Sequence, residues 1–233
     1  MEKLKILVVG VGGLGCPASL GLAEAGVETL GLMDPDKVEV SNLHRQVLYS
    51  KGDVGNSKVE AAAKFLRRNY PSVNIIPLME SMTTETMNKY LKDYDLVVDG
   101  LDRLEKKFFL NDKCVQARKP FVHAGVVKFE GQVLAIQPGV TACLRCLIPK
   151  IPPPFAMPTC QEAGVLGSFS QTIGYLQAHE ALRLVAKKDP FRLWKLDAQK
   201  RETRSIVPQR NPECEACGKG KVGEKPMETA CAS

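Results

Sequence analysis

No stretch of this sequence is both apolar and long enough to cross a bilayer, because its longest apolar runs, such as Ile6–Val9, have only the length of strands. The first residues, Met1–Lys5, carry neither an apolar signal region nor a cleavage site, and they lead directly into a strand pattern. We therefore expect a cytoplasmic protein that has no membrane partner.

A basic run interleaved with aromatic residues is also missing. The net charge of +6 comes from lysines and arginines that are scattered along the chain, several of them near its end, as Lys219 and Lys221 are. Nucleic-acid binding would need such residues gathered on one surface. We expect no nucleic-acid partner, and an anionic nucleotide is the charged ligand that we infer.

Strand and helix signals alternate along the first half of the chain, which is the pattern of a parallel sheet with helices on both faces. Beyond it, two strands joined by a short turn predict that the sheet becomes antiparallel. The predicted strands are Lys5–Val9, Thr29–Met33, Asn74–Leu78, Asp95–Val98, Phe121–Val127, Gln132–Ile136, Arg192–Leu196 and Thr203–Val207. Three helices are predicted: one begins near Pro17, and the other two cover Asn56–Asn69 and Val165–Ala186.

Two segments are predicted to be irregular. Pro149–Pro158 holds five prolines in ten residues, so we expect an exposed crossover segment. Lys219–Ser233 has the composition of a disordered tail. We therefore expect one domain over residues 1–218, followed by that tail.

The segment between the first strand and the first helix fits the G-x-G-x-x-G pattern, with glycines at Gly10, Gly12, Gly13 and Gly15. Such glycines permit a tight turn and let backbone N–H groups approach a phosphate at a helix N-terminus. Asp34 ends the second strand, where it can accept hydrogen bonds from a ribose. We infer a Rossmann-like α/β fold that binds a nucleotide. The motif alone leaves open an NAD-dependent oxidoreductase, or a turn that serves only helix–strand packing.

Three further residues favour nucleotidyl transfer over hydride transfer. Arg45, in the run Ser41–Gln46, and Lys58 can neutralise a triphosphate and the charge that develops on its α-phosphate. Asp102, after the fourth strand, can hold Mg²⁺ on phosphate oxygens. Taken singly, Arg45 and Lys58 could be surface charges, and Asp102 could cap the following helix. We interpret His44 as a space-filling neighbour of Arg45 and not as a base.

Four of the eight cysteines form two C-x-x-C units, Cys143 with Cys146 and Cys214 with Cys217. A disulfide framework is not expected in a chain without a secretion signal, whereas four thiolates make the closed tetrahedral site that zinc prefers. Because a closed site leaves no open position, we predict a structural Zn²⁺. Redox-active or unpaired thiols are the alternative.

Another cysteine, Cys160, follows the proline-rich segment and precedes a glycine-containing helix start, where a thiol can have a lowered pKa. A reactive thiolate is one interpretation, and a buried or incidental thiol is the other. Cys16 and Cys114 are interpreted as small core residues.

In the order and combination of these motifs, the chain resembles the ThiF and MoeB family of sulfur-carrier adenylyltransferases, relatives of the ubiquitin-activating enzymes. The resemblance runs from about Lys3 to Gly218 and includes the segment Thr159–Gly164. It implies a homodimer with a site in each subunit, and later acyl or persulfide chemistry at Cys160. The ATP site that it implies is formed by Gly13, Asp34, Asn42, Arg45, Lys58 and Asp102.

The chain departs from this family at three places. From the resemblance we expect it to be without the N-terminal arm that in relatives sends an arginine into the partner's ATP site, so that this arginine is either dispensable or replaced by another residue. Arg103 stands where the family usually has asparagine, which adds a positive charge beside the predicted metal aspartate. The crossover around Pro152–Pro154 also differs, and it would line the acceptor channel.

The predicted function is transfer of AMP from Mg·ATP to the C-terminal glycine carboxylate of a ubiquitin-like sulfur-carrier protein ending in Gly-Gly. A sulfur donor would then displace AMP to give a thiocarboxylate. Catalysis needs positioning and charge neutralisation but no general base, since a carboxylate is already nucleophilic at neutral pH. The alternatives are adenylation of a small-molecule or peptide carboxylate and a non-catalytic nucleotide-binding module. The pathway, whether thiamine, molybdopterin or another sulfur metabolite, stays open.

Overall fold

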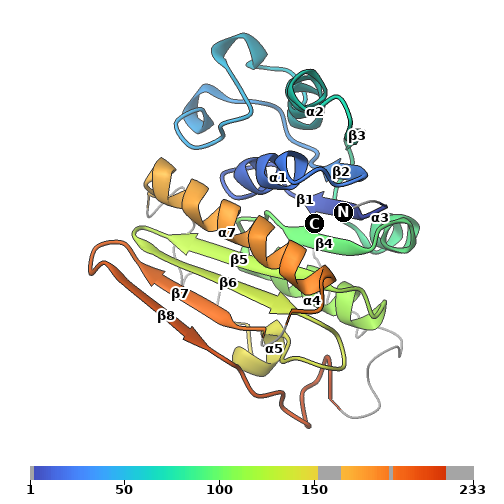
Figure 1. Ribbon diagram of the computed structural model, residues 1–233, viewed down its shortest axis with the longest axis vertical. Coiled ribbons are helices and arrows are strands. Elements are labelled where there is room, and N and C mark those ends of the chain that lie inside the picture. The colour runs from blue at the N-terminus through green and yellow to red at the C-terminus, as the bar shows by residue number, and fades with distance from the viewer. Residues whose placement is uncertain (1–2, 152–163, 189–190, 219–233) are drawn as a thin grey trace.

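The computed structural model describes residues 3–151, 164–188 and 191–218. In this part of the chain, one sheet of eight strands has the order β3-β2-β1-β4-β5-β6-β7-β8 (Figure 1). The pairings from β3 to β5 are parallel, and those from β5 to β8 are antiparallel. The strands are β1 (Lys5–Val9), β2 (Thr29–Met33), β3 (Asn74–Leu78), β4 (Leu96–Asp99), β5 (Phe121–Val127), β6 (Glu130–Ile136), β7 (Leu193–Asp197) and β8 (Glu202–Ile206).

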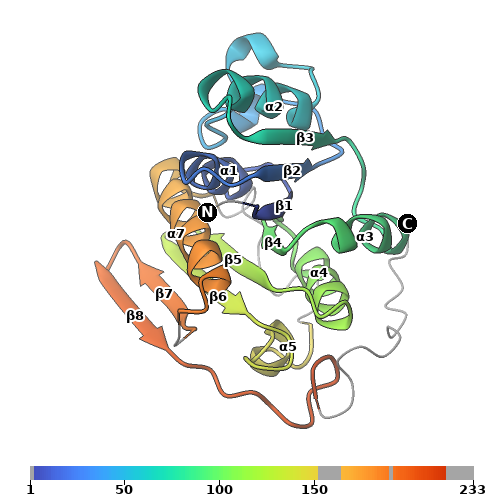
Figure 2. The ribbon, with the colours of Figure 1, turned by 45° about the vertical axis from the view of Figure 1, so that its right-hand side comes forward.

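Helices cover both faces of this sheet (Figures 1 and 2). The residues of α1, α2 and α7 belong to the apolar cluster on one face, and those of α3, α4 and α5 to the cluster on the other. The helices are α1 (Gly15–Glu24), α2 (Lys58–Asn69), α3 (Thr84–Tyr90), α4 (Leu104–Gln116), α5 (Leu144–Leu147) and α7 (Gly167–Val185), with short 3₁₀ turns at Val40–Asn42, Lys51–Asp53 and Leu91–Asp93.

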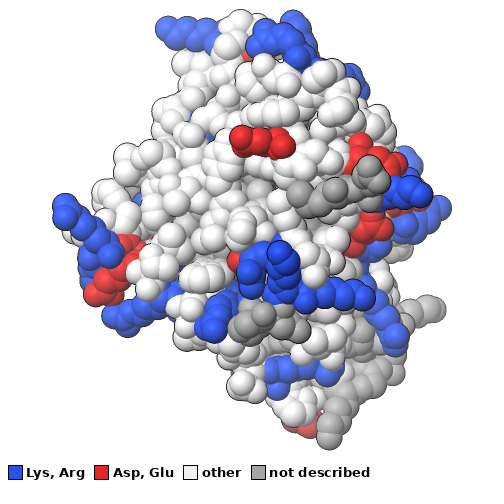
Figure 3. Space-filling model, viewed as in Figure 1, with Lys and Arg blue, Asp and Glu red and all other residues white. Residues whose placement is uncertain are grey.

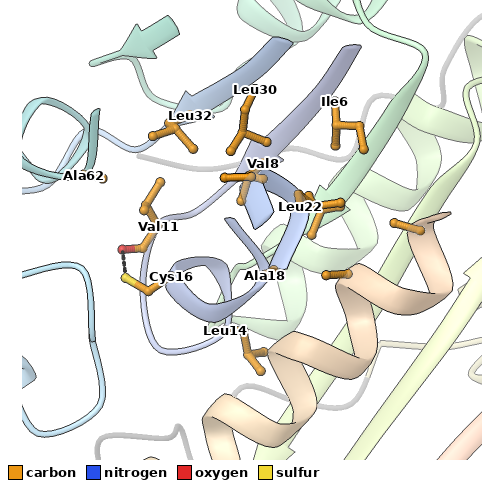
Figure 4. Packing of buried hydrophobic residues seen from close by; sticks show 14 of the residues in the cluster. Ile6, Val8, Val11, Leu14, Cys16, Ala18, Leu22, Leu30, Leu32 and Ala62 are labelled. Atoms are coloured by element: carbon orange, nitrogen blue, oxygen red, sulfur yellow. Dashed lines mark hydrogen bonds between the residues drawn. The ribbon is translucent and has the colours of Figure 1, made fainter. Parts of the chain in front are cut away.

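The central strand β1 shows why the sheet is buried on both faces. Its side chains alternate, so that Ile6 and Val8 enter the first cluster while Leu7 and Val9 enter the second, and all four are at most 1% exposed. Figure 4 shows Ile6 and Val8 beside Leu22 of α1, with α7 running along the other side of that helix. A strand that is apolar on both faces is thus explained by helices above and below it.

The predicted α/β class, with a mostly parallel sheet that becomes antiparallel, is confirmed. The predicted bounds of β1, β2, β3 and β5 agree with the structure, and those of the other strands differ by one or two residues. The long helix begins at Gly167 and not at Val165. α3 and the thirteen-residue α4 were not predicted as elements. Of the predicted crossover Pro149–Pro158, residues 149–151 belong to no helix or strand, and residues 152–158 lie outside the described residues, as does the predicted tail over residues 219–233. The single domain over residues 1–218 stays a prediction.

Lys and Arg lie in separate groups on the face of Figure 3, several of them next to Asp and Glu. None of the helices in the described part of the chain combines the length and the apolar character that spanning a membrane requires.

Candidate functional site

Three loops meet where the strand order reverses. β2 and β3 follow β1 to one side, whereas β4 pairs with its other side, so β1 and β4 form a topological switch point. Val9, the last residue of β1, is in register with Met33 of β2 and with Asp99 of β4. The segments that follow these three residues therefore emerge at one edge of the sheet, where open α/β sheets bind their ligands.

The glycine turn over residues 10–15 packs closely against the loop after β4. Gly10 has φ +88°, a conformation that side chains disfavour. A Cβ on Gly15 would lie 1.9 Å from the Gly10 carbonyl oxygen, and one on Gly100 would lie 2.1 Å from the same atom. Gly10 and Gly15 are therefore required by close backbone packing, which is the alternative interpretation of the glycine motif given above. Gly13 is packed closely as well, since a Cβ there would lie 3.0 Å from Ser170 Oγ and 3.4 Å from Arg45 Cδ. Packing does not account for Gly12, where a Cβ would come no closer than 3.7 Å to the Gln46 side chain.

Asp34 anchors the turn from the end of β2. Its carboxylate accepts hydrogen bonds from the backbone N–H of Val11 at 2.8 Å and of Asp36 at 2.9 Å. The residue is 6% exposed. Burial raises the pKa of Asp34, against the opposing effects of Lys58 and of the two N–H groups. The predicted ribose acceptor is therefore held rigidly at the mouth of the glycine turn, and each oxygen keeps a free lone pair.

Lys58 is the first residue of α2 and lies 6% exposed beside Asp34. Its ammonium is 2.9 Å from Asp36 Oδ2 and 4.0 Å from Asp34 Oδ1. A buried lysine held between two carboxylates is not a solvated surface charge, so the surface alternative is wrong for this residue. Because an ammonium has three donors, Lys58 can keep Asp36 as a partner and donate to a phosphate as well.

Arg45 lies over the glycine turn. Its Nη2 donates to Asn42 Oδ1 at 2.7 Å, and Asn42 is 5% exposed. A Cβ on Gly13 would lie 3.4 Å from the Cδ of Arg45, so the arginine flanks the turn directly. His44 Nε2 lies 3.3 Å from Arg45 Nη1, so it is a neighbour of the arginine, but its side chain is exposed and does not fill space in the interior as predicted.

Gln46 supplies an independent sign of a ligand at this turn. It is 4% exposed, and its Oε1 has no hydrogen-bond partner among the described residues. A Cβ on Gly12 would lie 3.7 Å from its Nε2, which places the amide beside the turn. Buried polar atoms are rarely left without a partner. An acceptor without a partner beside Gly12 leaves a place for a donor group of a ligand, such as a hydroxyl.

Asp102 lies between β4 and α4 and is exposed. The N-cap of α4 is Arg103, and no side chain caps the helix, so the alternative that Asp102 is a helix cap is wrong. Its carboxylate makes no hydrogen bond or ion pair with the described residues, which leaves its oxygens free to ligate a cation. Asp102 and Arg103 line a cavity of about 650 Å³ together with Leu14 of the glycine turn.

A buried ionic cluster lies beneath this cavity and was missed from the sequence. Asp99 is 1% exposed. The Lys107 ammonium lies 3.1 Å from each of its carboxylate oxygens, and His123 Nδ1 lies 2.7 Å from Oδ2. Burial opposes the ionisation of Asp99, but Lys107 and His123 outweigh it and lower its pKa. Burial in turn lowers the pKa of His123, against the hydrogen bond and charge of Asp99. Gln132 Nε2 lies 3.3 Å from His123 Nε2, so the network reaches the cavity wall.

The four predicted zinc ligands come together from distant parts of the chain. All four Sγ atoms lie within 4.8 Å of one another. The separations are 3.9 Å for Cys143–Cys146, 3.7 Å for Cys143–Cys214 and 3.3 Å for Cys146–Cys217. Four sulfurs about 2.3 Å from one zinc ion at tetrahedral angles are about 3.8 Å apart. The cluster thus has the donor atoms and the spacing of a closed zinc site.

The remaining cysteines separate into two groups. Cys16 and Cys114 are fully buried, which confirms their interpretation as core residues. Burial raises the pKa of Cys16 to about 12 and raises that of Cys114 as well, so neither is a thiolate at neutral pH. Cys160 lies outside the described residues, and its predicted role stays a prediction.

Comparison with known proteins places this geometry among adenylating enzymes. The profile described as the ThiF family matches residues 1–216. Among the relatives are a sulfur carrier protein adenylyltransferase of Thermus thermophilus, 39% identical over 94% of this chain and 83% of the relative, and a SAMP-activating enzyme E1 of Haloferax volcanii, 38% identical over 94% and 82%.

A longer relative also matches, and a solved structure shares the fold. A Bos taurus protein named adenylyltransferase and sulfurtransferase MOCS3 is 41% identical over 91% of this chain, which spans about half of its length (48%). A crystal structure of E. coli MccB has the same fold, with a TM-score of 0.81, 21% identity, and coverage of 97% of this chain and 68% of that one.

Proposed function

Because this chain belongs to the ThiF family, we propose that it is an ATP-dependent adenylyltransferase that activates the C-terminal glycine carboxylate of a ubiquitin-like sulfur-carrier protein. The observation that carries this proposal is the convergence of Asp34, Lys58 and Arg45 on one glycine turn at the switch point of the sheet. Relatives named as sulfur-carrier and SAMP-activating enzymes support the choice of acceptor.

In this proposal the triphosphate lies over the glycine turn and the ribose lies at Asp34. Arg45 and Lys58 meet the phosphate charge, and Asn42 keeps the guanidinium in place through the 2.7 Å hydrogen bond. Asp102 is the residue that would hold Mg²⁺, which when bound neutralises charge on the phosphate oxygens. Arg103 brings a further cation to the wall of the same cavity.

The chemistry needs no protein base. A carboxylate oxygen of the acceptor attacks the α-phosphorus, the bond to the bridging oxygen breaks, and pyrophosphate leaves with its electron pair. Acyl-adenylate and pyrophosphate are the products. The protein residues bring the two anions together and stabilise charge that grows in the transition state, which are the main sources of rate in phosphoryl transfer.

Further parts of the proposal concern partners and the second step. We place the protein in the cytoplasm as a homodimer, with a structural Zn²⁺ at the four cysteines and a sulfur donor that displaces AMP. Cys160 is assigned to that later acyl or persulfide step. Thiolate ligands for zinc require a compartment that keeps thiols reduced, which agrees with this location.

ATP–pyrophosphate exchange tests whether the acceptor is a carrier protein ending in Gly-Gly. Purified protein with Mg·ATP, labelled pyrophosphate and a panel of carriers ending in Gly-Gly is expected to exchange label into ATP only when a cognate carrier is present. A carrier with an amidated C-terminus is the matched control, because it keeps the protein contacts but lacks the nucleophilic carboxylate. Exchange with small carboxylic acids and with none of the carriers would contradict the proposed acceptor.

Nucleotide preference separates adenylation from hydride transfer. Calorimetric titration is expected to give an affinity for ATP with Mg²⁺ at least about tenfold higher than for NAD, because Lys58 and Arg45 form charge-assisted hydrogen bonds with a triphosphate. Lys58→Met should make this difference in affinity smaller, because it should weaken the binding of ATP more than the binding of NAD. Tight binding of NAD together with no binding of ATP would rule out the proposed reaction.

A further inference from the structure

The first turn of α1 lacks one of its own hydrogen bonds. Cys16 N–H donates to the Gly12 carbonyl at 2.9 Å, and Ala18 N–H donates to the Leu14 carbonyl at 3.1 Å. Between them stands Pro17, which has no N–H. The Gly13 carbonyl, the acceptor that residue 17 would serve, therefore has no donor within its own helix.

A serine from the far end of the chain supplies this donor. Ser170, in the first turns of α7, donates from Oγ to the Gly13 carbonyl oxygen at 2.8 Å, across 157 positions of sequence. Ser170 is 1% exposed, so water cannot readily take its place. The Gly13 carbonyl is half-buried and loses its helical donor to the proline, and the buried Ser170 hydroxyl replaces that hydrogen bond.

Close packing holds the hydroxyl at this position. A Cβ on Gly174 would lie 2.4 Å from Pro17 Cγ, and one on Gly167 would lie 2.4 Å from the His44 carbonyl oxygen. α7 thus rests on the start of α1 and on the Ser41–Gln46 run without intervening side chains. Figure 4 shows the two helices side by side. Ser170 has little freedom to move away from Gly13.

We propose that Ser170 is a positioning residue for the adenylation reaction, which holds the Gly13 peptide in the orientation that receives the triphosphate. The inference rests on the proposed function. Since a peptide group is planar, fixing the Gly13 carbonyl also fixes the Leu14 N–H, which points the opposite way. The first N–H groups of a helix have no helical acceptor and are the donors offered to phosphate. Arg45 flanks the same glycine, so the peptide that Ser170 holds lies beside the guanidinium side chain that is proposed to meet the phosphates.

The pair Pro17 and Ser170 gives a test in which one substitution repairs the other. Ser170→Ala is expected to raise the KM for ATP in the exchange assay about tenfold, the usual order for a buried group that loses its partner. In Pro17→Ala/Ser170→Ala, the new N–H of residue 17 can donate to Gly13, and the KM is expected to return to within about threefold of wild type. The matched control is Thr172→Ala on the same helix, whose exposed hydroxyl donates to the Ser168 carbonyl at 3.1 Å and to no other described residue.

Each outcome decides the inference. If Ser170→Ala has the KM of Thr172→Ala, Ser170 does not position the turn. If Ser170→Ala is impaired but the double variant is not repaired, while both melt at the wild-type temperature, the hydrogen bond is not the cause. Failure of the wild-type protein to exchange with any carrier would count against the proposed function alone. Calorimetric affinities for Mg·ATP of the same four proteins would then decide the role of Ser170.

Discussion

Asp102→Ala and Arg45→Ala are each expected to lower ATP–pyrophosphate exchange by about a hundredfold or more. The guanidinium of Arg45, held by Asn42 at 2.7 Å, is preorganised for charge at the phosphates, and the carboxylate of Asp102 is free to ligate Mg²⁺ there. Removing such an electrostatic partner costs on the order of a hundredfold to a thousandfold in rate. Initial exchange rates at saturating carrier measure the effect, and Asp93→Ala, an exposed carboxylate outside the site, is the charge control.

Cys160→Ala gives the contrast that assigns the two steps. A thiol has no role until the acyl-adenylate exists, so this variant is expected to keep exchange within about twofold of wild type while losing thiocarboxylate or covalent carrier product. Mass spectrometry of the carrier detects that loss. If a folded Cys160→Ala protein lost exchange as fully as Asp102→Ala does, the division between adenylation and sulfur chemistry would be wrong.

The fold was predictable where local patterns and topology agree. Lys5–Val9 is apolar at every position after the first, a glycine turn follows it, and a helix comes next, so strand, turn and parallel sheet were all expected. α4 was missed because its buried face includes Lys107, Asn111 and Lys113 among the apolar residues. In a sequence these residues have the character of a solvated surface, and only the tertiary partners reveal that they are inside.

The same reasoning explains what was found and missed at the site. Arg45, Lys58 and Asp102 were predicted because motif order implies convergence at one sheet edge. The burial of Lys58 between two carboxylates depends on the approach of α2 to β2, which no local pattern reports. The bond between Ser170 and Gly13 joins residues 157 positions apart, and the absent N–H of Pro17 was its only local signal. Sequence motifs therefore predicted the candidate charged residues, but not the hydrogen bonds that orient them.

The cluster of four cysteines has a further structural consequence. Cys143 directly precedes α5 and Cys146 lies on it, whereas Cys214 and Cys217 lie on the segment after β8. That segment passes beneath α5 in Figure 2. Of the five residues of the edge strand β8, four are exposed and one is half-buried, so β8 contributes little apolar burial of its own. A metal shared by both pairs of cysteines would tie this end of the chain to the apolar cluster below the sheet.

Cys214→Ser is therefore expected to lower the thermal midpoint by about 10 °C or more and to reduce bound zinc from one per chain to well below one. Structural zinc contributes its binding free energy directly to folding, and a serine cannot replace a thiolate ligand. Differential scanning calorimetry and metal analysis measure the two effects. Cys16→Ala is the matched control, because it removes a buried thiol that is not in the cluster and should leave the zinc content unchanged.

The exchange reaction supplies the decisive comparison for this site. At a temperature where Cys214→Ser is still folded, exchange per folded molecule is expected to stay within about threefold of wild type, because a closed four-sulfur site has no open position for substrate. A chelator should reproduce the loss of stability in the wild-type protein and add little to the variant. Less than about a tenth of an equivalent of zinc in freshly purified wild-type protein would contradict a structural metal, given how tightly such sites bind. Exchange abolished in a folded Cys214→Ser protein would instead mean that the cluster acts on the chemistry.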